Sequence, residues 1–124
     1  MRTLTTIAAL LAASPALAQT QAEMNARAGS ALKTADAAMT ATWRATYAAM
    51  KRRDAAMPTR GGGYGYAAAT LDSQRAWLKF RDAQCMIESA EFAGGSMQPL
   101  ARTQCLTRLT RERTRQLGTM QWKR

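Results

Sequence analysis

The sequence predicts an all-α protein: a small three-helix bundle with a disulfide-linked C-terminal helix hairpin. A four-helix arrangement of the same segments is the alternative. Three observations support this fold class. Nowhere in the 124 residues do β-branched and polar residues alternate over the length of a strand. Three segments instead carry apolar residues at helical spacing, separated by glycine-rich breaks, and each of the last two contains one cysteine.

The N-terminal stretch has the composition of a signal peptide. Arg2 provides a positive charge, residues 4–17 are mostly apolar, and residues 16–18 form the small-x-small motif of a signal peptidase site. The apolar run is shorter than the roughly 20 residues that span a bilayer. We therefore expect residues 1–18 to be a cleaved signal peptide and residues 19–124 to form a single helical domain that is periplasmic or secreted.

Three helical segments follow in order. The first covers residues 21–57 and is rich in Ala, Met, Lys and Arg. Pro58 and a run of glycines after it predict a loop. The second and third segments cover residues 67–92 and 97–120, and Gly-Gly-Ser at residues 94–96 separates them. In such a turn a glycine ends one helix in a left-handed cap and the serine caps the start of the next.

The two cysteines predict a disulfide across this turn. Cys85 lies about ten residues before it and Cys105 about ten after it, so an antiparallel hairpin places them opposite each other. An oxidising compartment favours the bond. The alternative is a redox-active pair, which usually has the closer Cys-x-x-Cys spacing.

Helical projection places a charged residue on the apolar face of each segment. The apolar faces consist of Leu32, Met39, Trp43 and Met50; of Leu71, Leu78, Cys85 and Phe92; and of Leu106, Leu109, Leu117 and Met120. Because an unpaired buried charge is costly, we expect a core ion network of Asp36, Arg81, Glu88 and Arg113. Replacing either arginine would then destabilise by roughly 3–5 kcal/mol. A ligand site or a carboxylate catalyst is the alternative for this cluster.

Composition excludes several kinds of chemistry. The chain has 18 Lys and Arg against 8 Asp and Glu, a net charge of +10, and no histidine. Histidine-based triads and general bases are therefore absent. Two cysteines without histidine do not provide the ligand groups of a zinc site. We expect no cofactor, no metal and no enzymatic activity.

The exposed charges predict one candidate contact surface. Arg108, Arg111 and Arg115 share the side of the third segment that faces solvent, and Lys51, Arg52 and Arg53 form a second basic run. An exported basic protein meets anionic cell-wall polymers and membrane headgroups rather than nucleic acid. These six residues are the candidate surface for an anionic partner.

The sequence resembles the N-terminal domain of the lysozyme inhibitor LprI family over essentially all of residues 19–124. The resemblance rests on Cys105-x-x-x-Leu109-Thr110-x-x-Arg113-x-x-x-Leu117, on the Gly-Gly-Ser turn and on Leu71-x-x-Gln74-Arg75-Ala76-Trp77-Leu78-x-Phe80-Arg81-Asp82-x-x-Cys85. It extends upstream to Asp36-x-x-Met39 and to Gln21-x-Glu23-Met24-Asn25. Arg27 stands where many members have a further cysteine, and Thr40 and Trp43 replace an asparagine and a tyrosine. The resemblance implies a small exported helical domain that binds lysozyme.

Three functional hypotheses follow. The first is an exported binding protein of the LprI type that inhibits lysozyme. C-type lysozyme is itself basic, and the exposed acids available to meet it are chiefly Asp54, Asp72 and Glu91. The second is a basic protein that binds anionic cell-wall or lipid groups. The third, a carboxylate-dependent hydrolase, would use a pair drawn from Asp72, Asp82, Glu88 and Glu91.

Overall fold

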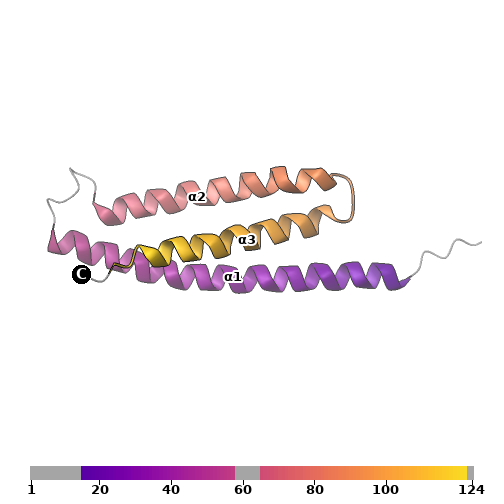
Figure 1. Cartoon of the computed structure of the whole chain (residues 1–124), viewed down its shortest axis with the longest axis horizontal. Helices are drawn as coiled ribbons and strands as arrows, with labels where there is room; N and C mark the ends of the chain where they lie inside the picture. Colours follow the sequence, from indigo (N-terminus) through magenta and orange to yellow (C-terminus); the bar gives the residue numbers. More distant parts are fainter. Residues whose placement is uncertain (1–14, 58–64, 123–124) are drawn as a thin grey trace, which may run out of the picture.

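The computed structural model describes residues 15–57 and 65–122 and is a three-helix bundle (Figure 1). The helices are α1 (Pro15–Ala56), α2 (Tyr66–Ser89) and α3 (Gln98–Thr119), and a short 3-10 helix, η1 (Ala90–Phe92), follows α2. α2 runs antiparallel to α1 and α3, which run in the same direction. The described residues contain no strand. The predicted all-α class and the three-helix arrangement are confirmed, and the four-helix alternative is wrong for this part of the chain.

A disulfide holds the hairpin of α2 and α3 together. Cys85 and Cys105 are bonded, with their Cα atoms 5.5 Å apart, so the predicted pairing is confirmed. Both cysteines are buried with Leu109, and Trp77 and Leu106 pack against them. This cluster is the apolar core between the two helices.

The turn between α2 and α3 differs in detail from the prediction. Gly94 adopts φ +80°, a left-handed conformation that favours glycine, as expected. The serine does not cap α3, because the N-cap residue is Met97. α2 ends at Ser89, and the 3-10 turn after it leaves Phe92 40% exposed. The expectation that Phe92 belongs to the buried face was therefore wrong.

Asp54 joins the end of α1 to the start of α2. Its two carboxylate oxygens accept hydrogen bonds from the backbone N–H groups of Tyr66 (2.6 Å) and Ala67 (2.9 Å). The first N–H groups of a helix have no partner within the helix, and a carboxylate at this end also favours the helix dipole. Asp54 is therefore a helix cap, not a free exposed acid as the sequence suggested.

Small polar residues fill much of the contact between α1 and α3. Thr46 and Thr110 are fully buried. The Thr46 hydroxyl donates to the Leu117 carbonyl oxygen at 3.0 Å and accepts from the Gln121 amide at 2.9 Å. A buried hydroxyl is tolerated when it is hydrogen-bonded. These residues allow the two helices to pack with few large apolar side chains.

The expected signal peptide falls largely on residues 1–14, which lie outside the described residues. Residues 15–18 form the start of α1. Among the described helices, none combines the length and hydrophobicity of a membrane-spanning segment.

Candidate functional site

Arg81 of α2 occupies the centre of the bundle and contacts both other helices. Its guanidinium lies 3.4 Å from the Asp36 carboxylate of α1 and 3.2 Å from the Thr110 hydroxyl of α3. It also donates to Asp82 at 3.0 Å. The side chain of Asp36 is 48% exposed, so this ion pair lies at the edge of the core. Arg81 thus joins three helices without burying a carboxylate.

Arg113 of α3 is buried, 7% exposed, and its hydrogen-bond partners are neutral. It donates to the Gln74 side-chain oxygen at 2.9 Å, the Ser73 hydroxyl at 2.9 Å and the Gln116 side-chain oxygen at 3.3 Å. Burial lowers the pKa of the guanidinium from its ordinary value. The expected pairing of Arg113 with a carboxylate is wrong. The side-chain amide of Gln74 and the hydroxyl of Ser73, both on α2, accept the hydrogen bonds that a carboxylate was expected to accept.

Trp77 connects the two arginines. The guanidinium groups of Arg81 and Arg113 lie 5.3 Å and 5.8 Å from the centre of its ring. Cation–π contacts of this kind orient an arginine without a carboxylate. Gln74 and Trp77 were not among the residues that the sequence predicted for the network. The four-residue spacing from Trp77 to Arg81 could have predicted their contact, because residues four apart are neighbours on one face of a helix.

Glu88 lies outside this cluster, contrary to the prediction. It accepts from Arg108 of α3 at 2.7 Å and from Gln84 of its own helix at 3.0 Å. Hydrogen bonds from Gln84 and Arg108 lower the pKa of the Glu88 carboxyl. Glu88 is on the surface because its side of α2 faces outward at the end of the hairpin.

The four carboxylates considered for a hydrolase are all exposed. Glu88 and Glu91 line one shallow groove of about 390 Å³ beside Arg108. Asp72 and Asp82 do not line it. A general acid needs a raised pKa, and the pKa of Glu88 is shifted the other way. In the described part of the chain, His, Cys, Asp and Glu form no group of three or more that could hold a metal ion.

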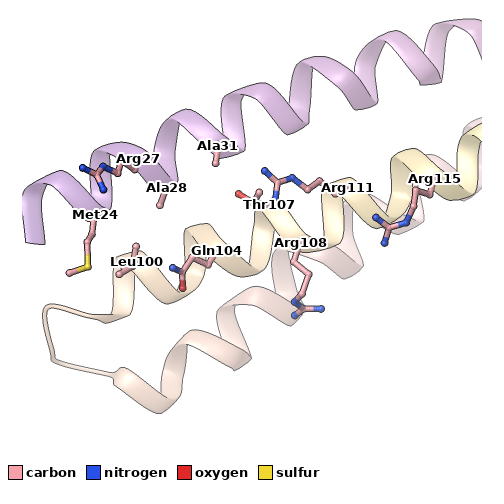
Figure 2. Close-up of a pocket in the computed structure, with 10 residues that line it drawn as sticks. All are labelled: Met24, Arg27, Ala28, Ala31, Leu100, Gln104, Thr107, Arg108, Arg111 and Arg115. Carbon is pink, nitrogen blue, oxygen red and sulfur yellow. The ribbon is translucent and has the colours of Figure 1, made fainter.

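A larger groove of about 570 Å³ lies between the N-terminal part of α1 and α3 (Figure 2). We call it the arginine groove, and it is lined by Met24, Arg27, Ala28 and Ala31 of α1 and by Leu100, Gln104, Thr107, Arg108, Arg111 and Arg115 of α3. Three of the predicted basic surface residues therefore line one concave site.

The other three predicted basic residues lie elsewhere. Arg52 and Arg53 line a separate groove near the end of α1, and no residue lines both grooves. Arg53 lies 4.7 Å from the Trp122 ring centre and donates to the Trp122 carbonyl oxygen at 3.3 Å. Lys51 lies 4.8 Å from the ring centre of Tyr47. Aromatic contacts thus hold two of these cations beside the helices.

α2 exposes an apolar stripe on the side that faces away from the bundle. Ala76, Phe80, Ala83 and Ile87, spaced at intervals of four, three and four residues, form this outer stripe. Phe80 is 53% and Ile87 68% exposed. Contiguous exposed apolar residues mark interaction surfaces. The stripe was not predicted from the sequence, because only one apolar face was assigned to each helix.

Charge is unevenly distributed over the helices. α2 and η1 together carry four carboxylates and three cations, a net charge of −1. α3 carries five arginines and one glutamate, a net charge of +4, and α1 has a net charge of +3. The outer stripe is therefore on the least basic part of the described structure.

Comparison with known proteins assigns the chain to a family. The family model described as lysozyme inhibitor LprI matches residues 12–117. An uncharacterised protein of Rhizobium meliloti (strain 1021) is 38% identical over 101 residues, which cover 81% of this chain and 73% of that protein. No solved structure matches the chain. The match spans most of the sequence, and the chain therefore belongs to the lysozyme inhibitor LprI family.

Proposed function

We propose that this protein is exported and acts by binding lysozyme, without chemistry of its own. The observation that carries the proposal is the match to the lysozyme inhibitor LprI family over residues 12–117. The Cys85–Cys105 disulfide supports export, because disulfides persist in oxidising compartments.

The outer stripe of α2 is the surface that fits this partner best. Phe80 offers an exposed aromatic anchor, and Ile87 extends the apolar area by two helical turns. Asp72 lies one turn before Ala76, and Glu91 follows Ile87 by four residues, in η1. An apolar centre with a carboxylate at each end suits a cationic enzyme, because complementary charges steer the encounter.

Net charge alone opposes this association, since both proteins are basic. Screening reduces interactions between exposed charges beyond about 8 Å at physiological salt. The α2 surface then interacts with lysozyme mainly through its own local charges, while the cations of α1 and α3 contribute little. We therefore expect inhibition to be maintained or strengthened when salt is raised from a low to a physiological concentration.

The test is lysis of peptidoglycan by c-type lysozyme, with and without the oxidised protein, at both salt concentrations. The variant Phe80→Ser/Ile87→Ser removes the anchors from the outer stripe. Loss of one interface anchor typically costs about 2 kcal/mol or more, so inhibition should weaken at least about 30-fold. The matched control Phe92→Ser/Met97→Ser removes exposed apolar side chains from the hairpin turn and should inhibit as the wild type does.

Two outcomes would contradict the proposal in different ways. Absence of inhibition by the wild-type protein at either salt concentration would exclude lysozyme as the partner. Equal inhibition by the stripe variant and the wild type would retain lysozyme but exclude the α2 surface.

A further inference from the structure

The arginine groove combines apolar walls with several arginine side chains. Its walls include the apolar side chains of Met24, Ala28, Ala31 and Leu100. Arg27, Arg111 and Arg115 line the same space. Figure 2 shows Ala28 and Ala31 directed from α1 toward α3, with Arg111 between the two helices. A volume of about 570 Å³ is in the range of small-molecule sites.

The cations of this groove are poorly neutralised. Among the described residues, Arg111 and Arg115 form no ion pair. Arg27 has one loose and highly exposed contact, 3.9 Å from Glu23. Arg108 differs, because Glu88 holds it and its side chain points toward α2 (Figure 2). The groove therefore presents about three positive charges that lack a firm internal partner.

We propose that the arginine groove binds a single anionic lipid, with the phosphate at Arg111 and Arg115 and part of an acyl chain along Ala28, Ala31 and Leu100. Arginine binds phosphate oxygens through two parallel N–H groups, which makes these side chains suited to a phosphodiester headgroup. The apolar wall distinguishes a lipid from a purely anionic polymer, since a polymer gains nothing from buried alanine and leucine surface. This site is separate from the α2 surface and does not depend on lysozyme binding.

The probe is dihexanoyl-phosphatidylglycerol at concentrations where it is monomeric, titrated into the protein purified after expression of the full chain. Glycerol phosphate supplies the headgroup chemistry alone, and dihexanoyl-phosphatidylcholine supplies the chains with a zwitterionic headgroup. Calorimetry should show binding of phosphatidylglycerol that is at least about tenfold tighter than that of either comparison compound, because both parts of the groove are needed.

Two variants test the arginines and the apolar wall of the groove separately. Arg111→Gln/Arg115→Gln should lower the affinity for phosphatidylglycerol at least about tenfold. Its matched control, Arg44→Gln/Arg75→Gln, removes the same charge from exposed positions outside the groove and should change the affinity less than about twofold. Ala28→Phe fills the groove at constant charge and should also lower the affinity about tenfold. Circular dichroism of each variant checks that the helices remain folded.

Three results would overturn the proposal. Equal losses in the two double arginine variants would mean that the lipid responds only to net charge. Wild-type affinity in folded Ala28→Phe would mean that no chain enters the groove. Equal affinities for glycerol phosphate and phosphatidylglycerol would mean that the site binds phosphate alone.

Discussion

The outer stripe of α2 and the arginine groove of α1 and α3 are built alike and charged oppositely. Each has an apolar centre formed by residues one or two helical turns apart, and each has charged residues at its edges. Carboxylates at Asp72 and Glu91 lie at the ends of the stripe. Arginine residues line the groove. The stripe is a convex helix surface, whereas the groove is concave.

This difference shows why the net charge of +10 is a poor guide to the partner. Most of the excess charge belongs to α1 and α3, and α2 with η1 is slightly acidic. Since exposed charges interact over roughly one Debye length, each surface meets its partner through the charges near it. The two proposals therefore assign separate surfaces of this basic protein to a cationic enzyme and to an anionic lipid.

The largest expected loss of stability comes from removing the disulfide, which supports both surfaces. Cys85→Ala/Cys105→Ala should destabilise the folded state by roughly 3 kcal/mol, because the bond closes a loop with a sequence separation of 20. Denaturant unfolding of the oxidised wild type and the variant measures the difference. Both lysozyme inhibition and lipid binding should weaken, because α2 carries the stripe and the hairpin positions α3 beside α1.

Chemical reduction of the wild-type protein is the matched control, and it should produce the same loss of stability as the double variant. A loss below about 1 kcal/mol in both would show that the hairpin is held mainly by its other contacts. If lipid binding then survived and inhibition did not, the two surfaces would be independent of each other.

The sequence predicts the architecture well because its signals are local. Helical spacing defines the three segments, and two cysteines equally far from a turn define the register of the hairpin. The charged interior was predicted less well. Projection places Arg81 and Arg113 inward, but it does not show which neighbours they meet, since that depends on how the helices are rotated about their axes. Their neighbours include Gln74 and Thr110, polar residues whose burial is decided by packing.

The surfaces were harder still to predict. The arginines of α3 were identified from their spacing, but the groove needs Met24, Arg27 and Ala28 from a segment more than 70 residues away. Asp54 was considered an exposed acid, because nothing in its local sequence shows that the start of α2 returns to it. Long-range partners of single polar residues are determined by tertiary structure.

An intermediate loss of stability is expected from substitution of Arg113, in the interior between the two surfaces. Arg113→Met should destabilise by roughly 1–3 kcal/mol, because it leaves the buried Gln74 oxygen without its donor. This is less than the 3–5 kcal/mol expected when a buried carboxylate loses its partner. The double variant Gln74→Leu/Arg113→Met removes both polar groups and should recover most of the loss, as measured by denaturant unfolding.

The corresponding substitution at Arg81 is the comparison for the Arg113 variants. Arg81→Met should destabilise by about 1–2 kcal/mol, because half-exposed Asp36 stays in contact with water but the buried Thr110 hydroxyl loses its donor. A loss of 3 kcal/mol or more at Arg81 would show that the Asp36 pair, and not the neutral network of Arg113, dominates the interior.

The smallest expected effect concerns Glu88, which links the stripe-bearing helix to the groove through Arg108. Hydrogen bonds from Gln84 and Arg108 place the pKa of the folded carboxyl below its ordinary value of about 4.5. Stability from this group is therefore fully present above the unfolded pKa and is lost as pH falls through the folded pKa. Between neutral pH and pH 2, the melting temperature of Glu88→Gln should fall slightly less than that of the wild type.

Glu112→Gln is the matched control, since Glu112 is an exposed carboxylate of α3 that forms no ion pair within the described residues. Its melting temperature should follow the wild type over the same range of pH. Glu88→Gln also releases Arg108, which lines the arginine groove, so phosphatidylglycerol should bind about twofold more tightly at neutral pH. If Glu88→Gln changed the pH profile without changing the lipid affinity, Arg108 would support the hairpin alone and contribute nothing to the groove.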